Sequence, residues 1–190
     1  ETIFIHIPKT AGISISKTIF GENKGHTKAV HYQIYNEDKF QKYYKFSFVR
    51  NPWDRFVSAF FYLQKGGRND QDKNWAKKHI LPCVDIKDFI LRIANNSGFK
   101  DQVLSHQHFE PQVEYLKNKD GVIDIDYIGH FENLHDDFNA ITKKIDINGK
   151  LKKINVNKEK DHFKTYYNAE TQGIIQDLYA EDIEALDYEW

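Results

Sequence analysis

Two short apolar runs in the first third of the chain predict buried β-strands, and a helical pattern follows each of them directly. The first run covers residues 2–7 and stops at Pro-Lys-Thr-Ala-Gly, after which residues 12–20 have helical spacing. The second covers residues 45–50 and leads into a helix over 52–64. Right-handed crossovers would make the two strands parallel neighbours, with their carboxyl ends at one edge of a sheet.

The rest of the chain predicts further helices and one more strand, with no repeat or linker-like tract to mark a domain boundary. We therefore expect one α/β domain over residues 1–190. The remaining elements are a helix near 36–43 capped by Asn36, a helix over 85–94, a strand over 122–129, helices over 131–145 and 171–186, and a lysine-rich loop over 150–167.

Composition favours a folded core over disorder or a disulfide scaffold. The 190 residues include 14 Phe, 11 Tyr and 3 Trp, while Gly and Pro are sparse. Cys83 has no second cysteine to pair with, which fits a reducing compartment. No stretch approaches the roughly 20 apolar residues that span a bilayer, so we expect a soluble polypeptide without an integral membrane segment. The chain does not begin with Met, which leaves open an upstream leader or anchor.

Charge is distributed unevenly along the chain. Residues 1–68 carry 11 Lys and Arg against 5 Asp and Glu, whereas residues 69–190 carry 16 against 23, and the net charge is −1. This distribution argues against a nucleic-acid partner and favours a local anion site in the first part of the chain.

The segment from Ile3 to Ser14 has the strand, turn and helix order of a phosphate cradle. Backbone N–H groups at a helix N-terminus lack intrahelical partners and lie at the positive end of the helix dipole, so they bind anions. Lys9 would add a full positive charge, and Gly12 would let the backbone approach a ligand. Because Lys9 precedes Gly12, the segment differs from the ordinary ATPase or GTPase loop, in which lysine follows the glycines.

A second segment, Phe48 to Phe60, places Arg50 at a strand end and Ser58 two helical turns further on. A guanidinium fork and a hydroxyl at one end of a sheet could hold a second phosphate. The alternative is a packed helix whose charged residues, Asp54 and Arg55, lie on the surface.

Together the two segments resemble those of sulfotransferases that use 3′-phosphoadenosine 5′-phosphosulfate (PAPS), in particular the branch of the heparan sulfate 2-O-sulfotransferases and related carbohydrate sulfotransferases. The resemblance implies a P-loop-NTPase-like three-layer α/β fold, with a central, mainly parallel sheet flanked by helices. It also implies that Arg50 and Ser58 bind the 3′-phosphate and that Lys158 lies in a loop covering the nucleotide. The residues implied to bind the 5′-phosphosulfate are Pro8, Lys9, Thr10, Ala11, Gly12, Ile13 and Ser14.

The resemblance also implies the catalytic residues. Lys9 would stabilise the charge that develops on the leaving phosphate, and His26, in a Gly-His segment like that of the 2-O-sulfotransferases, would be the base that binds the acceptor hydroxyl. Ile13 stands where the family usually has Thr or Ser, so one side-chain donor is missing while the backbone donor remains.

Three further residues have two interpretations each. Gln112 could hydrogen-bond a sugar hydroxyl, or it could simply belong to a helix start. His6 lies on the strand before the loop and is better interpreted as a packed or hydrogen-bonding residue than as a ligand contact. His130 stands where the family more often has Arg, and its role is open.

The leading hypothesis is an O-sulfotransferase that moves a sulfuryl group from PAPS to a carbohydrate or glycoside, releasing 3′-phosphoadenosine 5′-phosphate (PAP). No metal is expected, since Lys9 and backbone donors can replace a cation and no metal-ligand spacing occurs. A bacterial-type cytoplasmic enzyme is favoured over a Golgi lumenal domain. A small P-loop kinase and a non-catalytic nucleotide-binding module remain as alternatives, and the acceptor and oligomeric state are open.

Overall fold

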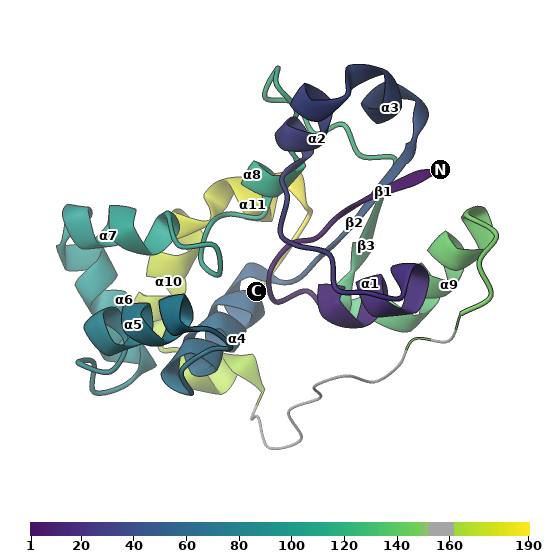
Figure 1. Ribbon diagram of the computed structural model, residues 1–190. Helices are drawn as coiled ribbons and strands as arrows, with labels where there is room; N and C mark the ends of the chain where they lie inside the picture. Colours follow the sequence, from purple (N-terminus) through teal and green to yellow (C-terminus); the bar gives the residue numbers. More distant parts are fainter. Residues whose placement is uncertain (150, 152–161) are drawn as a thin grey trace. The chain divides into compact units, whose positions relative to one another are not determined.

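The computed structural model describes residues 1–149, 151 and 162–190, which form two compact units (Figure 1). Unit 1 contains residues 1–50 and the described residues of 111–151, and unit 2 contains residues 51–110 and 162–190. The expectation of one domain over residues 1–190 stays a prediction.

Unit 1 is built on a sheet of three parallel strands in the order β1-β2-β3. The strands are β1 (Thr2–Ile5), β2 (Tyr44–Val49) and β3 (Tyr127–His130). The register pairs Phe4 with Phe46 and Phe46 with Tyr127. The two apolar runs of the sequence are therefore neighbouring parallel strands, as predicted.

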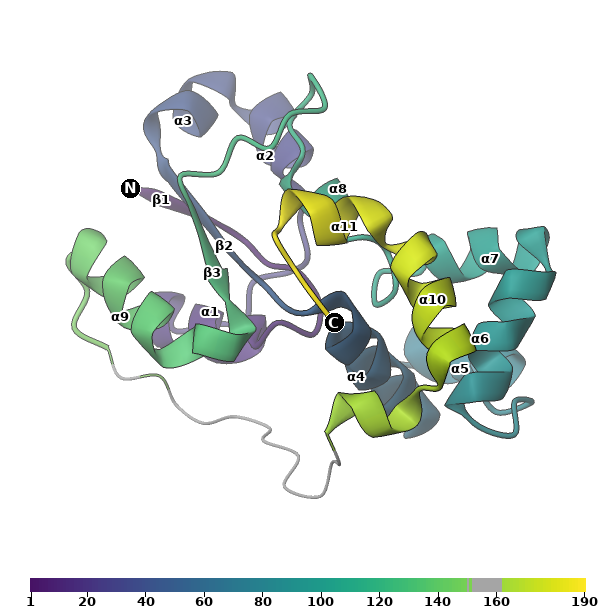
Figure 2. The same ribbon diagram turned by 180° about the vertical axis from the view of Figure 1, so that it is seen from behind.

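Helices lie against both faces of this sheet. Helices α1 (Gly12–Phe20) and α9 (Leu134–Lys144) lie side by side on one face, where Ile15 and Phe138 pack with Phe4 and Phe46 (Figures 1 and 2). On the opposite face, the ring of Phe40 in α3 (Glu37–Lys42) lies 5.0 Å from the Lys45 ammonium. The remaining helices of unit 1 are α2 (Ala29–Tyr35), α8 (Val113–Leu116) and the 3₁₀ helix η1 (Phe131–Asn133). The predicted α/β class, with a parallel sheet flanked by helices, is confirmed.

The secondary structure of unit 2, among its described residues, is helical and encloses an aromatic core. Trp53, Phe56 and Phe60 of α4 (Pro52–Gln64) are buried with Phe89 and Phe109. Asn51 caps α4 by accepting from the Trp53 and Asp54 N–H groups. The helices are α4 (Pro52–Gln64), α5 (Asp70–His79), α6 (Ile86–Asn95), α7 (Ser97–Leu104), η2 (Phe163–Tyr166), α10 (Ala169–Leu178) and α11 (Ala180–Ala185).

Several predicted elements differ from the observed ones. The helix expected over 131–145 begins as the 3₁₀ helix η1 and continues as α9, and the described end of the loop expected over 150–167 contains η2. The strand expected over 122–129 begins only at Tyr127, because Asp126 accepts from the Lys45 N–H through its side chain, where a regular ladder would use a carbonyl. The helix expected over 171–186 is two helices separated at Tyr179, whose hydroxyl donates to the Phe109 carbonyl over 2.6 Å. The sequence interpretation also missed α2, α5 and α7.

Among the described residues, no helix is both long enough and apolar enough to span a bilayer. In that same part of the chain, no three His, Cys, Asp or Glu side chains come together as metal ligands.

Candidate active site

The loop between β1 and α1 has an unusual backbone. Lys9 and Ala11 adopt positive φ angles of 72° and 66°, although neither is glycine, and Thr10 between them does not. Pro8 followed by Lys9 with positive φ fits the two central positions of a type II turn, the second of which is usually glycine. Each such angle costs on the order of 1–3 kcal/mol, and strain of this kind concentrates at functional sites.

The loop ends at the N-terminus of α1 in a form suited to an anion. Ala11 is the N-cap, has a left-handed backbone and makes no side-chain cap, and the first turn contains no acidic residue. The Ala11 carbonyl accepts from the N–H groups of Ser14 and Ile15. Alternation between left- and right-handed residues turns successive N–H groups toward one concave side, which is an anion-binding arrangement.

The side chains of the predicted loop residues contribute unequally. The Thr10 hydroxyl is buried and donates to the Ile7 carbonyl over 2.9 Å, so this hydroxyl is used within the loop and the backbone N–H is what Thr10 offers a ligand. Ser14 is also largely buried. Ile13 is half-buried at the start of α1, where its backbone is its only polar part.

Arg50 contacts the loop, because the parallel pairing of β1 and β2 places their carboxyl ends at the same edge of the sheet. It follows the last residue of β2, and its Nη1 donates to the Lys9 carbonyl over 3.1 Å. Its guanidinium carbon lies 4.0 Å from the centre of the Phe131 ring, which the sequence interpretation did not identify. A planar guanidinium stacks well on an aromatic face, so Phe131 fixes the plane of the Arg50 fork.

Gln112 is fully buried beside Arg50 and pairs with its backbone twice. The Gln112 Oε1 accepts from the Arg50 N–H over 2.9 Å, and the Gln112 Nε2 donates to the Arg50 carbonyl over 2.8 Å. The predicted acceptor contact of Gln112 stays a prediction. The observed bonds indicate a different role, because they fix the main chain of Arg50 just beyond the end of β2.

His26 and His6 lie together beside the start of α1. Their ring centres are 4.1 Å apart, and the His26 Nδ1 lies 3.0 Å from the His6 carbonyl oxygen. His6 is buried, and its Nδ1 lies 2.7 Å from the Lys24 carbonyl oxygen, which confirms a packed, hydrogen-bonding role. Burial, together with the neighbouring His26, lowers the pKa of His6 from 6.5 to about 4.

Acid should destabilise the protein through His6. Between pH 6.5 and about 4 the unfolded chain binds a proton at this ring that the folded protein excludes, so the free energy of unfolding falls as pH falls. The expected slope is at most roughly 1.4 kcal/mol per pH unit from this group. Urea unfolding at several pH values between 7 and 5 measures this slope. The His6→Asn variant should lack the contribution of this ring to it. Equal slopes in both proteins would contradict the assignment.

Two predicted contacts, Ser58 and Lys158, are not among the described residues of unit 1. Ser58 is half-buried in α4 and belongs to unit 2, whereas Arg50 belongs to unit 1. Their shared role at one phosphate stays a prediction. Lys158 lies outside the described residues.

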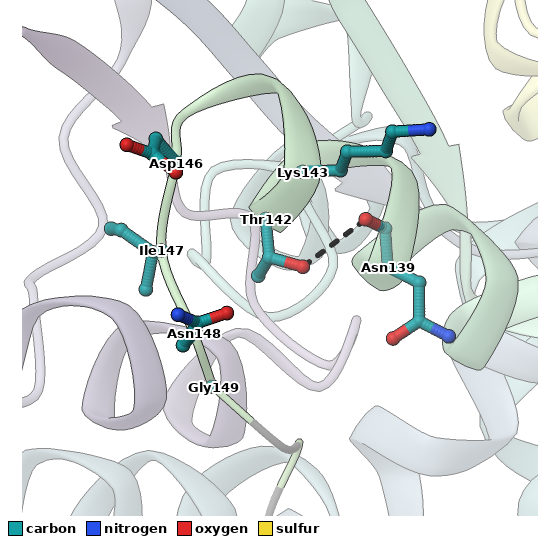
Figure 3. Close-up of a pocket in the computed structure, with 7 residues that line it drawn as sticks. All are labelled: Asn139, Thr142, Lys143, Asp146, Ile147, Asn148 and Gly149. Carbon is teal, nitrogen blue, oxygen red and sulfur yellow. Dashed lines mark hydrogen bonds between the residues drawn. The ribbon is translucent and has the colours of Figure 1, made fainter.

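A cavity of about 560 Å³ in unit 1 lies away from the loop (Figure 3). It is formed at the C-terminal end of α9 and the segment after it, and it includes none of the predicted site residues. Figure 3 shows the Lys143 and Asp146 side chains pointing in opposite directions. The Thr142 hydroxyl donates to the Asn139 carbonyl over 3.1 Å. The lining residues are Asn139, Thr142, Lys143, Asp146, Ile147, Asn148 and Gly149.

Comparison with known proteins identifies the family of the chain. A family model described as "Sulfotransferase family" matches residues 2–189. The chain belongs to the sulfotransferase family. A protein of Archaeoglobus fulgidus described as "Uncharacterized protein" is 27% identical over 106 residues, covering 56% of this chain and 70% of that protein. No solved structure matches the chain.

Sulfuryl transfer is the general activity of this sulfotransferase family, and the match includes both the loop and Arg50. The family resemblance noted in the sequence is thereby confirmed.

Proposed function

We propose that this sulfotransferase moves a sulfuryl group from PAPS to a hydroxyl of a carbohydrate or glycoside, and that residues 1–190 form one domain for this reaction. The observation that carries the proposal is the strained Lys9–Ala11 backbone, which leads into an uncapped helix N-terminus and is bonded by Arg50. A bisphosphorylated nucleotide offers this region two anionic groups. The loop N–H groups and the Arg50 fork are suited to such a ligand.

Each residue has a defined part in the proposed reaction. PAPS supplies the sulfuryl group, which leaves the bridging oxygen of the 5′-phosphate and becomes bonded to the acceptor oxygen. Lys9 and the N–H groups of residues 10–14 stabilise the negative charge on the leaving phosphate. His26 accepts the proton of the acceptor hydroxyl. Arg50, together with Ser58 and Lys158, holds the 3′-phosphate and nucleotide.

The tautomer of His26 suits this role. A carbonyl oxygen can only accept, so the His26 Nδ1 carries the hydrogen in its bond to the His6 carbonyl. In the neutral ring, Nε2 then bears the lone pair and can take a proton. The backbone contact thus selects the tautomer that a general base needs.

Transfer of labelled sulfate tests the proposal. The protein is incubated with ³⁵S-labelled PAPS and a panel of sugars, glycosides and oligosaccharides, and labelled product and PAP are measured. We expect label in a carbohydrate fraction with an equal yield of PAP. Phosphate transfer from ATP with magnesium would instead support a kinase, and binding of PAP without turnover on any acceptor would support a nucleotide-binding module.

Gln112 provides a prediction that separates two roles. In Gln112→Ala the partly buried N–H and carbonyl of Arg50 lose the Gln112 side chain as their partner, which should lower the free energy of unfolding by about 1–3 kcal/mol. We also expect weaker PAP binding, because Arg50 is no longer fixed. Urea unfolding and calorimetry measure the two effects, with Gln102→Ala as an exposed control. An unchanged PAP dissociation constant with a raised acceptor KM would instead indicate an acceptor contact.

A further inference from the structure

The imidazole of His6 joins three parts of unit 1 that are separate in sequence. His6 directly follows the last residue of β1, and its ring lies against Gly12 at the start of α1. Its Nδ1 bonds the Lys24 carbonyl, in the segment that contains His26. Its ring also stacks on Phe4, with a centroid distance of 5.5 Å and an interplanar angle of 13°. The orientation of the ring is therefore determined from more than one side.

The hydrogen bonds fix the tautomer of both histidines. The Lys24 carbonyl accepts from the His6 Nδ1–H, and the His6 carbonyl accepts from the His26 Nδ1–H. The side chain of His6 thus holds residue 24, and its main chain holds the His26 ring. Residues 24–26 are attached to the loop at both points.

Gly12 makes room for this arrangement. A Cβ built at Gly12 would lie 2.0 Å from Cδ2 and 2.2 Å from Nε2 of His6, distances that no real contact allows. The His6 ring thus occupies the space where a side chain at Gly12 would project. The glycine of the loop is explained by this packing as well as by approach to a ligand.

We propose that His6 is a positioning residue, which holds residues 24–26 against the start of α1 so that His26 keeps its Nδ1–H tautomer beside the loop. The assignment rests on the proposed function in one respect, namely that His26 is the base. It requires a donor at the Nδ1 position, and the flat ring beside Gly12 adds packing. Histidine supplies both in its neutral form.

Two variants separate the donor from the ring. His6→Asn keeps a short side-chain donor able to reach the Lys24 carbonyl and loses the ring, whereas His6→Phe keeps a ring and loses the donor. We expect kcat to fall about 10- to 100-fold in His6→Phe, since small displacements of a reacting group cost this much. His6→Asn should retain most of the activity, and PAP affinity should change less than threefold in both.

The tautomer of His26 gives a readout independent of activity. Two-bond ¹⁵N–¹H spectra of the imidazoles should show His26 as the Nδ1–H form in the wild type and in His6→Asn, and as a mixture in His6→Phe. An unchanged Nδ1–H form in His6→Phe would overturn the proposal. So would a lower kcat in His6→Asn than in His6→Phe, because ring packing would then matter more than the donor.

The double variant His6→Phe/His26→Ala distinguishes this inference from the proposed function. If His6 acts through His26, His6→Phe should cost little further kcat in the His26→Ala background. Full, independent losses in the two positions would overturn the positioning role. If His26→Ala alone kept wild-type kcat, the base assignment would fail, and the tautomer spectra would still decide whether His6 positions His26.

Discussion

Lys9→Ala should reduce sulfuryl transfer by at least 10²- to 10³-fold, the loss typical when a group that stabilises charge in a transition state is removed. The loss should appear in kcat, since the N–H groups of the loop still bind the donor. We expect the PAP dissociation constant to rise by no more than about tenfold, a binding cost of about 1.4 kcal/mol. Initial rates with labelled PAPS and calorimetry with PAP provide the two measurements.

Lys17→Ala is the matched control for Lys9. Lys17 lies in the last turn of α1, beyond the loop, and is exposed, so its removal changes the charge by the same amount without altering the loop. It should leave kcat and PAP affinity near wild type. Near-normal turnover in Lys9→Ala, or an equal loss in Lys17→Ala, would show that Lys9 is not the catalytic cation.

His26→Ala should lower kcat by about 10²- to 10⁴-fold, the usual contribution of a general base. PAP affinity should stay within about twofold of wild type, because a base that serves the acceptor is not needed for donor binding. His31→Ala, an exposed position in α2, is the control. Retained kcat in His26→Ala, or a loss confined to PAP binding, would remove the base assignment and direct the search to another acceptor-side group.

The parallel sheet and its edge were predictable from the sequence because the signals were local and strong. The apolar runs at 2–7 and 45–50, each followed by helical spacing, indicate β1 with α1 and β2 with α4. Crossover handedness then brings the strand ends together, so the contact between Arg50 and the Lys9 carbonyl follows from topology. These local patterns gave the fold class and the neighbourhood of the site.

The finer parts of the site depended on contacts that no local pattern encodes. Positive φ at Lys9 and Ala11 could not be anticipated, since these residues disfavour it and only the surrounding structure imposes it. Phe131 and Gln112 reach Arg50 from distant segments. The sequence indicated that glycine at position 12 lets a ligand approach the backbone. The structure adds that a larger residue there would clash with the His6 ring.

Short helices were missed for a similar reason. Helix α5 is largely polar and α2 has only seven residues, so neither presents a long amphipathic pattern. Tertiary packing stabilises such elements more than local propensity does. The break at Tyr179 likewise arises from a buried hydroxyl bonded to a distant carbonyl.

Calorimetric titration of the wild-type protein with PAP and with ATP is the most direct test of the proposed donor, since it requires no knowledge of the acceptor. The account predicts that PAP binds at least tenfold more tightly than ATP, without magnesium, and that Arg50→Ala abolishes most of this preference. ATP binding that is tighter than PAP binding and depends on magnesium would contradict it.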